Sequence, residues 1–462
     1  MTGRLFLRIE EVNAMKLKEI DMKELLKGSK SCKCGREHKV DLKSVVVKEN
    51  AIDELPKIME KSNYKKAFLV ADKNTYQAAG RKVEKVLRDA NLSYTTMIYK
   101  EDLLIPDEKS VGSLTMAYDN TCDILIAIGS GTINDIVKFF SFKMNLSYYS
   151  IGTAPSMDGF ISTAAAMTTN NLKTTYISHV PGVFIGDLDV FSKAPMSMIA
   201  AGFGDIMGKY TCLQDWKMSS IVNDEFYCDY IADLVLNAVD TTRESFHGLL
   251  QRDKGAIKKL THGLLLSGIA MSFVGNSRPA SGSEHHMSHF FEMLYQYEKK
   301  EPILHGTKVG MTTILSLKLY ELLKEEEIDF EEVFKSYDHK ENEWESEIKS
   351  IYKGAWEGII DLEKKSGKNS YKKWEKRVDS TKNKIDEIKK LCKNLPSSKE
   401  IESLIKALEG PTDPSDLGID KEAVFHAIVH AKEIRDRYTI LQLLWDLGLL
   451  EKYANKLVYN KD

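Results

Sequence analysis

Carboxylate and imidazole side chains, which are common ligands of divalent metals, occur in three separate segments of the second half of the chain. Asp205 lies in a segment expected to begin a helix, and Lys209 follows one turn later. His285 and His289 are four residues apart, so a helix would place both imidazoles on one face. His305 belongs to the third segment. One aspartate and two histidines leave open positions on Zn²⁺, Ni²⁺ or Fe²⁺, and a catalytic metal site needs such a vacancy.

The histidines are concentrated around these segments. A single buried histidine is more often a structural residue than a ligand, but four of the eleven histidines lie between His285 and His305. We therefore predict one divalent metal ion per chain at this cluster. His262, His426 and His430 are treated as structural residues.

A glycine-containing loop, Gly129-Ser130-Gly131-Thr132, follows an apolar run that ends at Ile128, and a helix is expected from Ile133. Glycines let backbone amides approach an anion, and a helix N-terminus adds partial positive charge. Asn134 and Asp135 would lie in the first helical turn. Any tight turn can contain Gly-Ser-Gly, but the strand–loop–helix context favours binding of a dinucleotide cofactor.

Asp72 is expected at the carboxyl end of a strand that contains Val70 and Ala71. A carboxylate there accepts hydrogen bonds from ribose hydroxyls and repels a 2′-phosphate. Asp72 therefore favours NAD(H) over NADP(H), which remains the second choice. The alternative interpretation is that Asp72 only caps a helix.

Short apolar runs alternate with helical patterns in the first part of the chain. This alternation predicts a parallel sheet covered on both faces, in a doubly wound, Rossmann-like α/β layout. Asn170-Asn171, between threonine-rich runs, suggests a hairpin before Asp187. The expected strands span residues 44–48, 66–71, 93–99 and 123–128, with helices ending near 62, spanning 75–90 and starting at 133.

Beyond about Val190 the pattern is helical, with few strand signals. We predict three parts: an N-terminal extension (1–40), a dinucleotide-binding domain (41–190) and an all-α domain that binds metal and substrate (191–462). Met1 to Ala14 resembles an upstream extension, with Met15 as an alternative start.

The composition excludes several classes of protein. The 65 basic and 68 acidic residues give a formal charge of −3, so neither a nucleic acid nor a polybasic membrane contact is expected. No apolar run is long enough to insert into a membrane, and the N-terminus lacks a signal peptide, so a cytoplasmic protein is expected. Six cysteines in 462 residues argue against a disulfide framework.

Two segments have no assigned role. Cys32, Cys34 and His38 could seat a metal, but the spacing is not the usual C-x2-C pair and no second knuckle follows, so we expect a surface turn. Residues 321–400 are rich in Lys and Glu without a heptad repeat, which is typical of solvated helices on the outside of a domain.

Five blocks in a fixed order carry a family resemblance. Together they resemble the sn-glycerol-1-phosphate dehydrogenases, particularly the bacterial branch associated with arabinose operons, within the iron-containing alcohol dehydrogenase and dehydroquinate synthase superfamily. The resemblance covers about residues 30–320 and 411–450. The blocks are GSGTIND (129–135), TAPSMDG (153–159), GFGD (202–205), SRPASGSEH (277–285) and His305-Gly306.

The resemblance implies roles for individual residues. Asp205, His285 and His305 match the metal ligands, and His289 matches a histidine close to the metal. Asp158 matches an acidic residue near the substrate hydroxyls. The matches to cofactor contacts are Thr153, Ser156 and the glycine loop, Gly129, Ser130, Gly131 and Thr132.

The implied reaction is reversible reduction of dihydroxyacetone phosphate to sn-glycerol 1-phosphate. NADH would deliver hydride, the metal would act as a Lewis acid, and His289 or a metal-linked water would supply a proton, with Asp158 orienting the substrate. Arg278 precedes a segment fit to start a helix, so it is our candidate phosphate ligand, although it could equally pair with an acidic neighbour. Lys209 and Lys308 are the next candidates.

Three alternatives stay open at this point. Glycerol dehydrogenase and a dehydroquinate-synthase-like activity would use the same fold, and a non-catalytic, cofactor-binding regulatory protein would belong to a different class. Intact Asp205, His285 and His305 argue against the regulatory interpretation. A homo-oligomer is predicted, with a dimer as the first expectation.

Overall fold

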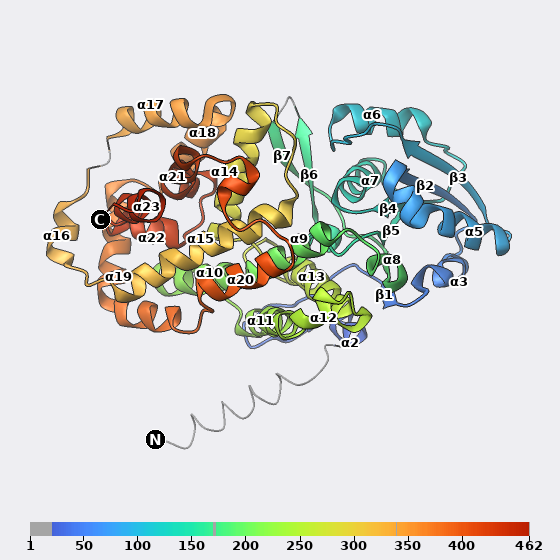
Figure 1. The fold of residues 1–462 in the computed structure, drawn as a ribbon, viewed down its shortest axis with the longest axis horizontal. Helices are drawn as coiled ribbons and strands as arrows, with labels where there is room; N and C mark the ends of the chain where they lie inside the picture. The colour runs from blue at the N-terminus through green and yellow to red at the C-terminus, as the bar shows by residue number, and fades with distance from the viewer. Residues whose placement is uncertain (1–20, 170–171, 339, 462) are drawn as a thin grey trace, which may run out of the picture.

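The computed structural model describes residues 21–169, 172–338 and 340–461. The first part of the predicted N-terminal extension, with Met15, therefore lies outside the described residues, as do Asn170 and Asn171. Figure 1 shows a sheet-containing half beside a larger helical half. The sheet half is built from the first part of the chain, and the helical half from the rest.

Six parallel strands form the main sheet, in the order β1-β8-β5-β4-β2-β3. The strands predicted from the sequence are present, and the fourth begins one residue later than expected. Two further strands, β5 and β8, complete the sheet. The bounds are β1 (Ser44–Lys48), β2 (Lys66–Asp72), β3 (Ser93–Tyr99), β4 (Ile124–Gly129), β5 (Tyr148–Gly152) and β8 (Val183–Asp187).

Helices cover both faces of this sheet because successive side chains of a strand point to opposite faces. In β2, Leu69 packs with α3 and α5, whereas Phe68 and Val70 pack with α6 and α7. The doubly wound α/β prediction is confirmed. The helices of this half are α3 (Leu55–Lys61), α4 (Lys73–Thr75), α5 (Arg81–Asp89), α6 (Glu108–Ala117) and α7 (Gly131–Lys143).

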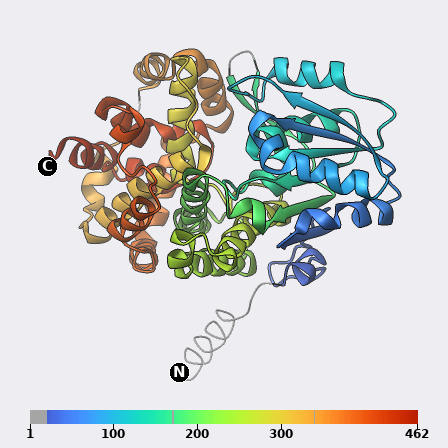
Figure 2. The ribbon, with the colours of Figure 1, turned by 45° about the vertical axis from the view of Figure 1, so that its right-hand side comes forward.

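The predicted helix over residues 75–90 is divided. A π-helical turn, η2 (Tyr76–Gly80), precedes α5. The predicted hairpin is also present, because β6 (Ala164–Thr169) pairs antiparallel with β7 (Leu172–Ile177). This hairpin lies between the two halves in Figures 1 and 2.

The second half is helical throughout its described residues, as predicted. Its first helices pack around one apolar core, and its later helices around another. The bounds are α8 (Leu188–Phe191), α9 (Met196–Met207), α10 (Lys209–Asn223), α11 (Asp229–Glu244), α12 (Phe246–Leu250), α13 (Lys254–Val274), α14 (Ser283–Tyr297), α15 (His305–Glu325), α16 (Phe330–Lys335), α17 (Glu341–Tyr352), α18 (Trp356–Ser366), α19 (Tyr371–Cys392), α20 (Ser398–Ala407), α21 (Lys421–His430), α22 (Ile440–Asp446) and α23 (Leu450–Tyr459).

The Lys- and Glu-rich helices α17, α18 and α19 lie on the outside of the helical half, and each buries one apolar face. Trp344, Ile360 and Trp374 come from these three helices and join the second core. At the other end of the chain, α2 (Met22–Leu26) contributes Met22 and Leu25 to the first core. Residues 21–26 are therefore packed against the protein.

Candidate active site

Asp205, His285 and His305 meet at one point although they come from three helices. Asp205 lies near the end of α9, His285 lies in the first turn of α14, and His305 begins α15. One ligand atom from each lies within 4.8 Å of the others. His285 Nε2 is 3.9 Å from Asp205 Oδ1, and the His285 and His305 rings are 5.2 Å apart. The three predicted ligands are therefore positioned to share one ion.

Glycines allow these elements to come so close. A Cβ added at Gly202 would lie 1.8 Å from the Pro155 carbonyl oxygen, and one at Gly306 would lie 2.0 Å from that of Ala201. At Gly204, the added atom would lie 2.7 Å from the Gly306 carbonyl oxygen. Two of the sequence blocks thus owe their glycines to the contact of α9 with α15 and with the loop after β5.

Lys209 is the buried cation that contacts both carboxylates of the site, Asp205 and Asp158. It is fully buried, and its Nζ donates to Asp205 Oδ1 at 2.8 Å and to the Ala280 carbonyl at 3.0 Å, and lies 2.8 Å from Asp158 Oδ2. Burial opposes ionisation of Asp158, but Lys209 outweighs it and lowers the pKa of that carboxyl to about 2. These three contacts occupy the three N–H groups of Lys209. The structure shows no N–H left for a phosphate, and the predicted contact of Lys209 with the substrate phosphate is untested.

Acidic partners orient two of the histidines. His285 Nδ1 lies 2.7 Å from Glu284 Oε1, and His289 Nδ1 lies 3.1 Å from Glu292 Oε2. Burial lowers the pKa of both His285 and His305 to about 3. Both imidazoles are therefore neutral at physiological pH, which is the state that binds a metal. A carboxylate behind a histidine ligand fixes the tautomer that offers Nε2.

Asp158 and His289 lie beside the three ligand-type residues. The Asp158 backbone N–H donates to Asp205 Oδ2 at 2.9 Å, and Ser267 Oγ donates to Asp158 Oδ2 at 2.8 Å. The His289 ring is 6.1 Å from both the His285 and the His305 rings. Its side chain is 27% exposed, against 6% for His285. His289 is thus the more accessible imidazole of the two.

The predicted cofactor residues lie at the carboxyl ends of adjacent strands. The register pairs Val70 with Ala127, so Asp72 and Gly129, each two residues further on, end β2 and β4 at the same level. The connections from these strands pass over opposite faces of the sheet, which makes this edge a topological switch point. Asp72 Oδ1 also accepts the Thr75 N–H at 2.8 Å, so the residue does cap a helix.

The first turn of α7 lacks a side-chain cap. Ser130, at its N-cap, makes no side-chain capping bond. Asn134 is fully buried, and neither polar atom of its amide has a hydrogen-bond partner among the described residues. Asp135 Oδ1 lies 3.5 Å from Lys138 Nζ. Thr153 and Ser156 are buried in the loop after the neighbouring strand β5.

Arg278 has a different setting from the one predicted. Its guanidinium donates to both carboxylate oxygens of Glu225, to Ser219 Oγ and to the Tyr438 carbonyl. It lines a cavity of about 570 Å³ whose lining residues include none of the three ligand-type residues. The alternative pairing of Arg278 with an acidic neighbour is therefore present, and its proposed contact with the substrate phosphate is untested.

Some residues that support the site were not predicted from the sequence. Glu284 bonds His285, Thr211 and the Gly282 N–H, and burial raises the pKa of its carboxyl. The position of Glu284 next to His285 in the sequence could have indicated this role. Ser267 is an uncharged residue in a long apolar helix, and nothing in its sequence context points to Asp158.

Known proteins resemble this chain over much of its length. The profile of the family described as iron-containing alcohol dehydrogenase matches residues 46–195. A glycerol-1-phosphate dehydrogenase (NAD(P)+) of Geobacillus thermodenitrificans is 32% identical over 429 residues, covering 92% of this chain and 97% of that protein. The protein of the same description from Pyrococcus horikoshii is 33% identical over 280 residues, covering 60% of this chain and 78% of that protein.

Solved structures share the fold at low identity. Sulfoacetaldehyde reductase from Bifidobacterium kashiwanohense, in complex with NAD+, matches with a TM-score of 0.59 and 13% identity, covering 92% of this chain and 99% of that one. Glycerol dehydrogenase from Schizosaccharomyces pombe matches with a TM-score of 0.57 and 14% identity, over 91% of each chain. In the part of the chain that is described, no helix has the length and apolarity needed to span a membrane.

Proposed function

The chain belongs to the glycerol-1-phosphate dehydrogenase (NAD(P)+) family, and from that premise we propose that it interconverts dihydroxyacetone phosphate and sn-glycerol 1-phosphate. Hydride would pass between the substrate and a nicotinamide cofactor. The observation that carries the proposal is the meeting of Asp205, His285 and His305 beside Asp158 and Lys209, in a chain similar to these relatives over nearly its whole length.

The donor set fits a divalent transition metal. One carboxylate and two neutral imidazoles suit Zn²⁺, Ni²⁺ or Fe²⁺ and leave positions for a substrate. When bound, the metal would act as a Lewis acid toward the substrate carbonyl oxygen, and NAD(P)H would supply the hydride. Lys209 holds Asp205 in place, and Glu284 orients His285, so that both ligands are preorganised.

The residues beside the ligands would manage the substrate and its proton. Asp158, kept ionised by Lys209, is a hydrogen-bond acceptor for a substrate hydroxyl. His289 would exchange the proton with the reacting oxygen, since its side chain is more exposed than that of His285. Burial lowers the pKa of His289, and the hydrogen bond with Glu292 opposes that shift.

The cofactor would bind along the edge formed by Asp72 and the glycine loop. The uncapped N-terminus of α7 suits the pyrophosphate, and Asp72 suits the ribose hydroxyls, which favours NAD(H). The loop of residues 153–158 leads from this edge to the metal cluster, through the bond between the Asp158 N–H and Asp205. The nicotinamide would therefore lie between the sheet and the cluster.

One observation favours a second candidate, glycerol dehydrogenase. Lys209 and Arg278, the cations proposed for the substrate phosphate, both have carboxylate partners in the protein. An enzyme for an unphosphorylated polyol needs neither cation.

Initial rates with the metal-loaded full chain separate the two candidates. We expect NADH to reduce dihydroxyacetone phosphate with a kcat/KM at least about tenfold above that for dihydroxyacetone, since one charge-assisted phosphate contact contributes about that factor. Equal or better use of dihydroxyacetone would support the polyol enzyme. Turnover of neither substrate, with NADH still bound, would support the regulatory interpretation.

A further inference from the structure

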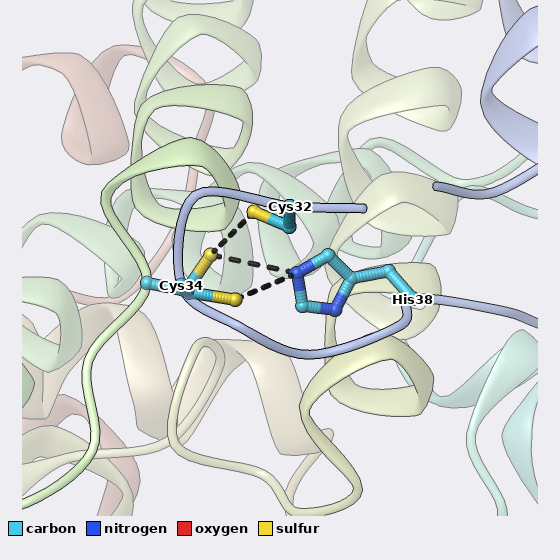
Figure 3. A group of neighbouring side chains, drawn as sticks. Cys32, Cys34 and His38 are labelled. Carbon is cyan, nitrogen blue, oxygen red and sulfur yellow. Dashed lines mark hydrogen bonds between the residues drawn. The ribbon is translucent and has the colours of Figure 1, made fainter. Parts of the chain in front are cut away.

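The segment of Cys32, Cys34 and His38 is not the plain surface turn that its sequence predicted. His38 is buried, and the chain brings a fourth ligand-type residue, Cys228, from the N-cap of α11. One ligand atom from each of the four lies within 4.8 Å of the others. Figure 3 shows the side chains of Cys32, Cys34 and His38 pointing toward one another. Cys32 Sγ is 3.7 Å from Cys228 Sγ, and His38 Nε2 is 3.3 Å from Cys34 Sγ and 3.6 Å from Cys228 Sγ.

These separations are those of ligands around one tetrahedral ion. Zinc bonds of about 2.3 Å to sulfur and about 2.0–2.1 Å to nitrogen place sulfur pairs roughly 3.8 Å apart and sulfur–nitrogen pairs roughly 3.5 Å apart. A disulfide bond is about 2.05 Å long, so the distance between Cys32 Sγ and Cys228 Sγ does not describe one. We propose that Cys32, Cys34, His38 and Cys228 bind a structural zinc ion.

The histidine is already oriented for this role. His38 Nδ1 lies 3.2 Å from the Phe273 carbonyl oxygen, to which it can donate its proton, and this leaves the Nε2 lone pair facing the sulfurs. A histidine ligand of zinc usually donates its second ring N–H to a carbonyl or carboxylate in this way. The ring also stacks on Phe273, with centroids 5.7 Å apart.

The backbone forms a tight loop around the site. Ser29 and His38 exchange N–H to carbonyl hydrogen bonds of 2.9 and 2.8 Å, and the Gly35 N–H donates to the Cys32 carbonyl at 2.9 Å. Gly35 has a φ of +81°, which favours glycine at the turn. The guanidinium carbon of Arg36 lies 3.4 Å from the Phe226 ring centroid and holds the loop against the helical half.

The ligand set decides the kind of site. Three thiolates and one imidazole complete a tetrahedral shell and leave no position for a substrate, as in structural zinc sites. The ion would join the segment before β1, the edge strand of the sheet, to α11 of the helical half. It is separate from the Asp205 cluster and does not depend on the proposed reaction.

Metal analysis of the full chain tests the proposal. His285→Ala removes a proposed ligand of the other cluster, so we expect this variant, purified from zinc-containing medium, to retain one zinc ion per chain. Cobalt reconstitution should give a thiolate-to-cobalt charge-transfer band, and X-ray absorption should report three sulfur neighbours and one nitrogen neighbour at the zinc. Adding Cys228→Ser should remove the retained ion, whereas adding Cys122→Ser, a buried cysteine elsewhere, should leave it.

The cobalt and X-ray absorption spectra of the wild-type chain test the proposal even if a variant fails to fold. A folded wild-type chain loaded with zinc and then cobalt, but without a thiolate band or sulfur scattering, would overturn the proposal. A Cys32–Cys228 disulfide found by non-reducing mass spectrometry of freshly purified protein would also overturn it. Failure of the catalytic proposal has a different signature: a thiolate-bound ion without turnover of dihydroxyacetone phosphate.

Discussion

Lys209 is the residue on which the charge balance of the candidate active site depends. Two carboxylates, Asp158 and Asp205, are buried within 2.8 Å of its ammonium group. Burying an unpaired charge costs several kcal/mol. Lys209 lowers the pKa of Asp158, whereas burial and the neighbouring Asp158 carboxylate raise the pKa of Asp205 in spite of the lysine. Lys209 lies four residues after Asp205, and the helical path turns it toward that residue.

The ligand assignment makes a direct prediction. We expect Asp205→Ala, His285→Ala and His305→Ala each to lose the ion of this cluster, because the site depends on its full ligand set. Turnover should fall by about a thousandfold, the upper range for loss of one group that stabilises a developing oxyanion. Metal content and kcat are the measurements, and His247→Ala, on the exposed surface of α12, is the control. If a variant keeps its full metal content and normal turnover, the residue replaced in it is not a metal ligand.

The proposed contact of Asp72 with the ribose predicts which cofactor the enzyme prefers. We expect the wild type to use NADH better than NADPH, and Asp72→Ser to narrow the ratio of their kcat/KM values by about tenfold, or about 1.4 kcal/mol. Serine removes the charge but can still cap the helix, so stability should change little. Strong preference of the wild type for NADPH would leave Asp72 with its capping role alone.

Arg278 has two possible roles that kinetics can distinguish. If it contacts the phosphate, Arg278→Ala raises KM for dihydroxyacetone phosphate about ten- to a hundredfold and leaves the reaction with dihydroxyacetone unchanged. Its bonds to Glu225 and the Tyr438 carbonyl favour the other outcome, which we expect: equal losses on both substrates and a lower Tm. Selective loss on the phosphorylated substrate would restore the sequence-based assignment.

At the scale of elements, the crossing of α9 and α15 sets the geometry of the proposed metal ligands. A methyl group at Gly306 would overlap the Ala201 carbonyl, so Gly306→Ala must push the helices apart. Overpacking of this kind costs about 1–3 kcal/mol. We expect a lower Tm and weaker metal binding. A Cβ at Gly358 in α18 would meet nothing within 4 Å, so Gly358→Ala should keep the Tm and the metal affinity of the wild type. If the two variants behave alike, the close contact at Gly306 does not set the ligand geometry.

The sequence predicted the elements better than their contacts. Strands β1 to β4 were found because their short apolar, β-branched runs alternate with helices. β5 was not assigned individually, since its Tyr-Tyr-Ser-Ile-Gly run is buried on both faces and has no alternating pattern. Cys228 was not linked to Cys34, because a tertiary contact between positions so far apart leaves no local pattern.

At the scale of the whole molecule, the candidate site lies where the sheet half meets the helical half. Asp158 belongs to a loop after the sheet strand β5, while its partners Lys209 and Ser267 belong to α10 and α13. The residues proposed to bind the cofactor and the metal therefore come from different halves, as an enzyme that transfers hydride between two bound groups requires. The dimer expected from the sequence stays a prediction.

The identity of the product tests the central claim most directly. The metal-loaded chain, given dihydroxyacetone phosphate and NADH, should consume equal amounts of both and form sn-glycerol 1-phosphate. An enzyme specific for sn-glycerol 3-phosphate should leave that product unoxidised, while it oxidises half of a racemic standard. Complete oxidation of the product by that enzyme, or consumption of NADH without a phosphorylated alcohol, would contradict the account.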